Sequence, residues 1–194
     1  MDADPLLRDT PGIGDGPDVD LLLAALVAER TGQRHLLDGD ADRARPYMRA
    51  AAAAYVASYP LAQPRSWGRL IGALKAGVLA GDGVTQATAA REALGDIADT
   101  PPACYLAALS ALVLGDHPGA LAHTPGMRSG GPAFDRAADG IEAIAQGDAA
   151  ALGDAIAAIE ADFAAREAHL TGIPIADTAL MLREIATSRA ENKK

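Results

Sequence analysis

Four Gly-Asp dipeptides, each closing an Ala- and Leu-rich run, limit the possible folds of this chain more than any other feature. They are Gly39-Asp40, Gly81-Asp82, Gly115-Asp116 and Gly147-Asp148, separated by 42, 34 and 32 residues. Glycine can adopt the left-handed conformation that ends one helix, and aspartate can cap the free N–H groups at the start of the next. A helix, a turn and a second helix, repeated at this spacing, predict a stack of antiparallel αα-hairpins.

Composition supports an all-α fold class. Hydrophobic residues make up 49% of the 194 residues but aromatic residues only 4%, so the interior must be built mainly from Ala, Leu and Ile. Small side chains allow helices to pack closely, and no long stretch alternates with the period of a β-strand. We expect one helical-repeat domain over residues 18–190, a short α-solenoid. A flexible N-terminal segment rich in Asp, Gly and Pro, residues 1–17, should precede it.

Apolar periodicity sets the expected helix boundaries. The expected helices cover residues 18–37, 44–58, 65–80, 84–98 and 101–113, with further helices through 134–144, 152–163 and 175–185. The second begins near Ala44 because Pro46 fits only the first turn of a helix. The stretch HPGALAHTPGMRSGGP, residues 117–132, breaks the pattern and predicts an exposed loop. The last helix is expected to close the exposed end of the stack.

Charge is unevenly distributed along the chain. The net charge is −9, yet residues 30–75 carry eight Arg and Lys residues against three aspartates. One interpretation is a basic surface that faces a protein partner, formed by Arg45, Arg49, Arg65 and Arg69. The alternatives are ordinary solvated helix faces, or neutralisation by the acidic helices of the same chain. A pI near 4.8 argues against nucleic-acid binding, which requires a basic surface.

The sequence predicts a cytoplasmic protein. Its longest apolar runs, Leu21–Ala28 and Ala50–Ala57, are too short to span a bilayer. The acidic N-terminus has no signal-peptide pattern. The single cysteine, Cys104, excludes an internal disulfide and suits a reducing compartment. Abundant Ala, Gly, Asp and Arg with only three Lys are typical of GC-rich bacterial genomes.

Motifs for catalysis or metal binding are missing from the sequence. None of the four histidines lies in a zinc-binding pattern, so we predict no metal, cofactor or catalytic residue. Asp116, His117, His123 and Asp135 could form a weak metal site if the expected loop folds back. Cys104 falls in the first turn of a helix, which can activate a thiol. Because the sequence offers no recognisable base to activate it, we expect Cys104 to be buried as a small apolar residue.

One segment resembles a known repeat family. Residues 39–60, GDADRARPYMRAAAAAYVASYP, are similar to the second half of a tetratricopeptide repeat. The positions that carry the similarity are Gly39, Ala44, Ala52, Tyr55 and Pro60. Pro46 departs from the family pattern, and the similarity reduces to the Gly-Asp turn in the later repeats. The resemblance implies a concave surface that binds a protein or peptide.

A second resemblance concerns the C-terminal third. A long helix bearing His169, a Gly/Pro linker and a closing apolar helix resemble the end of an all-helical immunity-protein family of bacterial polymorphic-toxin systems. The Trp-rich motifs of that family are absent. The sequence therefore favours a non-enzymatic protein-binding module, either an adaptor or an immunity- or antitoxin-like protein. The alternatives are a small-molecule-binding or enzymatic helical domain with a site near residues 116–135, and a structural homo-oligomer.

Overall fold

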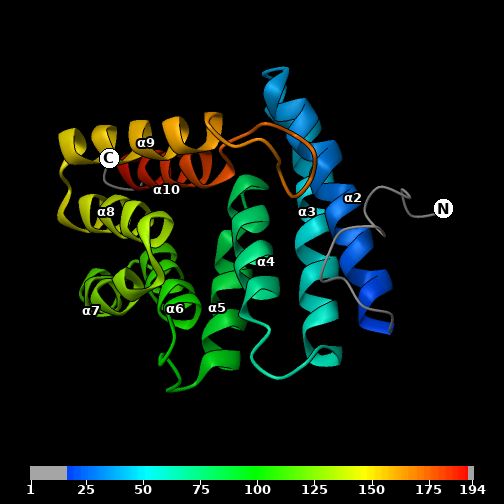
Figure 1. Cartoon of the computed structure of the whole chain (residues 1–194), viewed down its shortest axis with the longest axis horizontal. Helices are drawn as coiled ribbons and strands as arrows, with labels where there is room; N and C mark the ends of the chain where they lie inside the picture. The colour runs from blue at the N-terminus through cyan, green and yellow to red at the C-terminus, as the bar shows by residue number, and fades with distance from the viewer. Residues whose placement is uncertain (1–16, 192–194) are drawn as a thin grey trace.

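The computed structural model describes residues 17–191, which form nine α-helices, two 3₁₀ turns and no β-strand (Figure 1). The helices are α2 (Pro17–Leu37), α3 (Ala41–Ser58), α4 (Trp67–Leu79), α5 (Gly83–Leu94), α6 (Pro101–Val113), α7 (His117–Met127), α8 (Pro132–Gln146), α9 (Ala149–Ala164) and α10 (Asp177–Glu191). The predicted all-α class is confirmed. The predicted flexible segment, residues 1–17, lies outside the described residues apart from Pro17, where α2 begins.

All four Gly-Asp dipeptides form the predicted turn between two helices. Each glycine has a φ between +75° and +80°, in the left-handed region. The N–H of the following aspartate donates to the carbonyl five residues earlier, at 2.8–2.9 Å. Three of the four aspartate carboxylates accept N–H groups from the first turn of the next helix. Asp82 is the exception, since its carboxylate accepts the hydroxyl of Thr85. One helix therefore ends and the next begins within a single turn.

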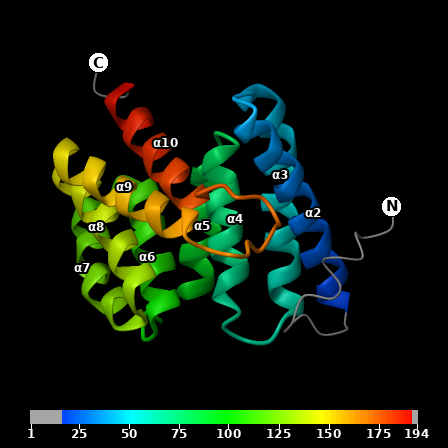
Figure 2. The ribbon, with the colours of Figure 1, turned by 45° about the horizontal axis from the view of Figure 1, so that its top comes forward.

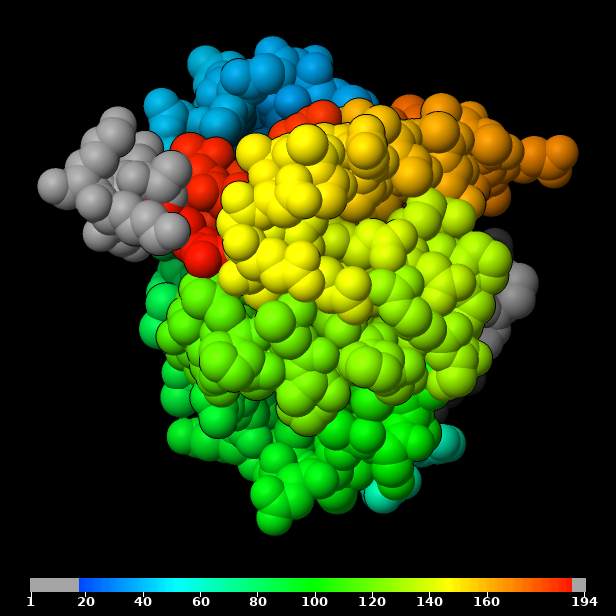
Figure 3. All heavy atoms as spheres, turned by 90° about the vertical axis from the view of Figure 1, so that its left-hand side faces the viewer, coloured from blue at the N-terminus to red at the C-terminus, as the bar shows by residue number. Residues whose placement is uncertain are grey.

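The turns produce four hairpins, α2–α3, α4–α5, α6–α7 and α8–α9, that stack in chain order. Figure 3 shows α7, α8 and α9 layered on one face of the stack. Helix α6 lies at the centre of the core, because ten of its thirteen residues are buried. Small residues allow this close packing. The methyl groups of Ala103 and Ala108 are fully covered, as are the larger side chains of Leu106 and Leu109.

Helix α3 begins earlier than predicted. It starts at Ala41 rather than near Ala44, with Asp40 as its cap, so Pro46 lies inside the helix. Proline cannot donate to the carbonyl of Asp42, four residues earlier. Asp42 is solvent-exposed in the first turn, where water can replace that bond. Pro46 is therefore tolerated in the second turn of α3, although proline normally fits only the first turn of a helix.

The expected loop at residues 117–132 is also a wrong prediction. The stretch forms α7, a short 3₁₀ turn (Arg128–Gly130) and the start of α8. Pro125 lies inside α7 and cannot donate to the carbonyl of Leu121, but the hydroxyl of Thr124 donates to that carbonyl at 3.1 Å. The alternative site near residues 116–135 was expected on an exposed loop, and that loop does not exist.

The C-terminal segment differs most from expectation. Helix α10 begins at Asp177, and residues 165–176 form a long linker that leaves His169 outside any helix. Figure 2 shows this linker passing in front of α4 toward the first hairpin. Helix α10 then packs on α9, as a closing helix should, and also across α4 and α8. Helix α10 therefore covers the side of the stack along α4 and α8, and not only the end of the stack at α9.

A glycine makes this placement of α10 possible. A Cβ atom on Gly140 of α8 would lie 2.6 Å from Cδ1 of Leu182 in α10, so the two helices approach too closely for any other residue without a shift. Ala179, Met181 and Leu182 are almost completely buried in the same core as α6. Helix α10 is consequently an integral part of the domain. An open concave groove, as the tetratricopeptide resemblance implies, is not present along α4 and α8.

Candidate ligand-binding cavity

A cavity of about 370 Å³ remains where the hairpin stack meets the C-terminal segment. Its walls come from α4, α6, α8 and α9, and from residues 166, 168–170, 177 and 178 of the C-terminal segment. The volume is in the range of small-molecule sites, typically roughly 300–1,000 Å³. Apolar side chains share the lining with a small number of charged groups.

A buried ion pair lies on one side of the cavity. Nζ of Lys75 in α4 is 2.7 Å from Oδ2 of Asp177, and both side chains are less than a fifth exposed. Burial lowers the pKa of Lys75, but the nearby Asp177, Tyr105 and Glu29 together raise it by more, so its pKa lies above the ordinary lysine value. The pKa of Tyr105 is also above its ordinary value, because burial disfavours the charged phenolate. Lys75 is therefore a fixed cation, not a neutral amine available as a nucleophile.

The same ion pair belongs to a polar network that anchors the C-terminal segment. The hydroxyl of Tyr55 donates to the buried carboxylate of Glu29 at 2.6 Å, and Thr171 donates to Gln33 one turn further along α2. Desolvation raises the pKa of Glu29, and the negative charge of Asp177 adds to the increase. Residues from α2, α3 and the linker thus meet in one buried cluster next to the cavity.

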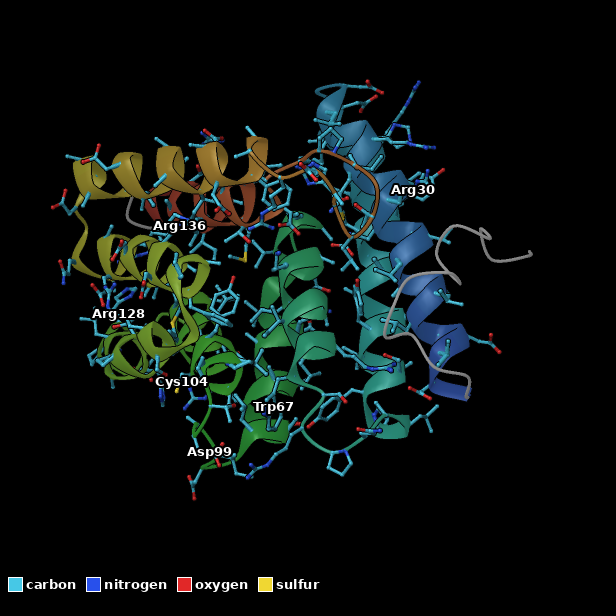
Figure 4. The ribbon with its side chains drawn as sticks, in the orientation of Figure 1. Arg30, Trp67, Asp99, Cys104, Arg128 and Arg136 are labelled. Carbon is cyan, nitrogen blue, oxygen red and sulfur yellow. The ribbon has the colours of Figure 1, made fainter. Side chains whose placement is uncertain are left out.

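A second charged group lies on the α8 and α9 side. Asp162 of α9 accepts from Arg136 of α8 and from Arg166, both at 2.6 Å. The hydrogen bond from Arg166 is the main cause that holds the pKa of Asp162 below its usual value. Arg166 also lies over the ring of Phe163, 4.4 Å from its centroid. Figure 4 shows Arg136 on the side of α8 that faces α9.

An aromatic stack completes this side of the cavity. The imidazole of His169 stacks on Phe163 with a centroid separation of 5.0 Å and an interplanar angle of 17°. This position contradicts the placement of His169 on a long helix, because α9 ends at Ala164. Phe134 of α8 makes an edge-to-face contact with Tyr105 of α6. The cavity therefore has planar apolar surfaces beside its charges.

The charged groups of the cavity are paired, and the single cysteine lies outside its lining. The lining also includes no serine. Cys104 lies elsewhere, buried, with its thiol donating to the carbonyl of Ala98 at 3.1 Å. Burial raises the pKa of that thiol, so it is not the activated thiolate that a helix N-terminus can produce. The interpretation of Cys104 as a small buried residue is confirmed.

The four arginines predicted to face a partner differ in their position and exposure. Arg45 lies in the first turns of α3 and Arg49 at its middle, while Arg65 and Arg69 follow the other end of α3 in the chain. Arg69 is mostly buried and pairs with Asp18 of α2. Arg65 pairs with Asp99, and Arg45 with Asp42. Contact of the exposed arginines with a partner stays a prediction.

Internal neutralisation accounts for much of the basic segment, residues 30–75. Ion pairs engage several of its cationic residues, namely Arg43, Arg45, Arg65, Arg69 and Lys75. Two acidic residues of α8 are neutralised in the same way, because Arg128 pairs with Asp139 at 2.8 Å and with Glu142 at 3.0 Å. The chain therefore supplies its own counter-charges for groups that the sequence alone offers to a partner.

The residues of the cavity carry little signal in the sequence. Asp162 and Arg166 are four residues apart in the chain, a spacing at which opposite charges often pair, although Arg166 lies just beyond the end of α9. The contact of Arg136 with Asp162 joins two helices and gives no local signal. The same holds for Lys75 and Asp177, which are about a hundred residues apart in the chain.

Metal sites and membrane spans are both missing from residues 17–191. These residues contain no group of three or more His, Cys, Asp or Glu side chains arranged to hold a metal ion, including the four proposed around residues 116–135. None of the helices in this range is both long and apolar enough to cross a membrane. Comparison with protein-family models, curated proteins and solved structures finds no match for this chain.

Proposed function

We propose that this chain is a non-enzymatic binding protein that holds a small organic ligand in the cavity between the hairpin stack and the C-terminal segment. The cavity itself is the main support, because a space of about 370 Å³ with mixed apolar and charged walls suits a small molecule. The mutual pairing of its charged groups favours reversible binding over bond chemistry. A cytoplasmic location in a bacterium is part of the same proposal.

The proposal is tested by filling the cavity. Ala133 lines the cavity and is solvent-exposed, so Ala133→Trp should occupy part of the space without disturbing the core. Ala53→Trp, at an exposed position of α3, is the matched control. In a thermal-shift screen of small organic compounds, a ligand at ten times its Kd should raise the Tm of wild type and control by about 3–6 °C. The increase should be absent in Ala133→Trp. Equal shifts in all three proteins would place the ligand elsewhere and refute the proposal.

A protein partner is the second candidate function. A groove of about 520 Å³ runs between the turns at Gly81 and Gly115 and the outer part of α10, and its lining is largely apolar. Val84 in this groove is 58% exposed. An exposed apolar groove favours an adaptor or immunity-like role, or self-association.

Light scattering over a range of concentrations, with wild type and Val84→Asp, tests self-association. A mass that rises with concentration in wild type but not in Val84→Asp would support the homo-oligomer. A constant monomer mass would exclude a second copy of this chain as the occupant of the groove and leave a different protein.

A further inference from the structure

We infer that the ligand of this cavity is an organic monoanion: a carboxylate carried on an aromatic or other flat apolar body. This inference rests on the proposed function and adds the chemical class of the ligand. It follows from the charge balance of the lining and from the arrangement of its planar apolar side chains.

The charge balance of the cavity opposes that of the whole chain. Three cations, Lys75, Arg136 and Arg166, face two carboxylates, Asp162 and Asp177, which leaves one positive charge in excess. The chain as a whole carries a net charge of −9. A cationic site in an acidic protein attracts a single anionic group more strongly than a neutral group. A cationic ligand would meet an unfavourable local field.

The excess charge is available to a ligand at the two arginines. Each guanidinium contacts Asp162 through Nη2, and a guanidinium has five N–H donors. Donors on Nη1 and Nε of both residues therefore remain for a ligand carboxylate. A carboxylate matches this planar arrangement because it can accept two parallel hydrogen bonds from one guanidinium. Lys75, in contrast, is already held by Asp177 in a buried contact.

The apolar lining indicates what the carboxylate is attached to. Ile71, Phe134, Ile159 and Phe163 line the same cavity as the two arginines. The ring of Phe163 contacts the guanidinium of Arg166 and stacks with the imidazole of His169, so flat groups already pack in this part of the cavity. An aromatic acid can place its ring against these side chains and its carboxylate against the arginines. Inorganic phosphate would leave the apolar walls uncovered, and a dianion exceeds the single excess charge.

Calorimetric titration with three probes tests the inference. The probes are phenylacetate, its neutral isostere phenylacetamide, and inorganic phosphate. We expect phenylacetate to bind about tenfold more tightly than phenylacetamide, equivalent to about 1.4 kcal/mol, and phosphate to bind more weakly than phenylacetate. Arg166→Gln should remove this preference because it removes the excess charge. Arg183→Gln is the matched control, since Arg183 forms a similar ion pair with Glu160 outside the cavity lining.

A substitution of opposite sign sharpens the test. Asp162→Asn removes one carboxylate and raises the excess from one positive charge to two, so it should strengthen phenylacetate binding and leave phenylacetamide binding unchanged. Equal affinity for phenylacetate and phenylacetamide in wild type would refute the anion inference while the cavity remains a neutral ligand site. Tighter binding of phosphate would refute the organic part of the inference. Failure of all three probes at millimolar concentration, together with no hit in the cavity-filling screen, would overturn the proposed function as well.

Discussion

One substitution, Gly→Ala, should have opposite effects on stability at two positions six residues apart. Gly147 ends α8 with a φ of +76°, and Gly153 lies at an exposed position inside α9. An added Cβ would meet no atom within 4 Å at either position. The two substitutions therefore have the same side-chain chemistry and no steric clash, and they differ only in backbone conformation.

The magnitudes follow from that conformation. The left-handed region costs an alanine about 1–2 kcal/mol, and part of this is offset by about 0.4–1 kcal/mol from the stiffer unfolded chain. Gly147→Ala should therefore lower the free energy of unfolding by about 1 kcal/mol. Gly153 already has helical backbone geometry, so Gly153→Ala should raise the free energy of unfolding by about 0.5–1 kcal/mol.

Urea denaturation followed by far-ultraviolet circular dichroism measures both changes. In thermal melts, Tm should fall by about 2–4 °C for Gly147→Ala and rise by about 1–4 °C for Gly153→Ala. Gly39→Ala, Gly81→Ala and Gly115→Ala should behave like Gly147→Ala, since their φ values and free space are equivalent. A stabilising Gly147→Ala, or two changes of the same sign, would show that the left-handed backbone is not what requires glycine in the Gly-Asp turns.

Three further predictions concern the interior. Gly140→Ala should cost about 1–3 kcal/mol of stability, because its Cβ would lie 2.6 Å from Leu182, and a double-mutant cycle with Leu182→Ala should show that the two changes are coupled. Lys75→Met should cost about 3–5 kcal/mol by leaving the carboxylate of Asp177 buried and unpaired, and adding Asp177→Leu should recover most of that loss in urea titrations. Because the folded-state pKa of Glu29 is raised above 4.5, protonation of Glu29 favours the folded state, and that contribution is lost as pH rises through the raised pKa. Glu29→Gln should therefore be more stable than wild type at neutral pH, and urea titrations at decreasing pH should show the difference closing toward pH 4.5; a constant difference would contradict this.

Local signals in the sequence account for the repeating part of the fold. The glycine that ends a helix and the aspartate that begins the next are adjacent residues, so the hairpin turns could be predicted without tertiary information. The rule that proline ends or begins a helix did not predict the positions of two prolines. Pro46 and Pro125 both lie inside helices, because the carbonyl left without a donor is either in an exposed first turn or satisfied by a neighbouring hydroxyl.

The candidate site depends on long-range contacts that local patterns do not encode. The arginines of residues 30–75 cluster in the chain, but in the folded protein Arg69 pairs internally, and Lys75 and Arg136 meet at one cavity. Asp177 and Thr178 at the start of α10 line that cavity, and α10 is placed by the close approach of Leu182 to Gly140. Helix ends and turns form through hydrogen bonds between residues near in sequence, so the all-α hairpin stack could be inferred from local patterns. Docking of α10 and pairing of distant charges depend on shape and desolvation across the folded core, so they became visible only once the helices were packed together.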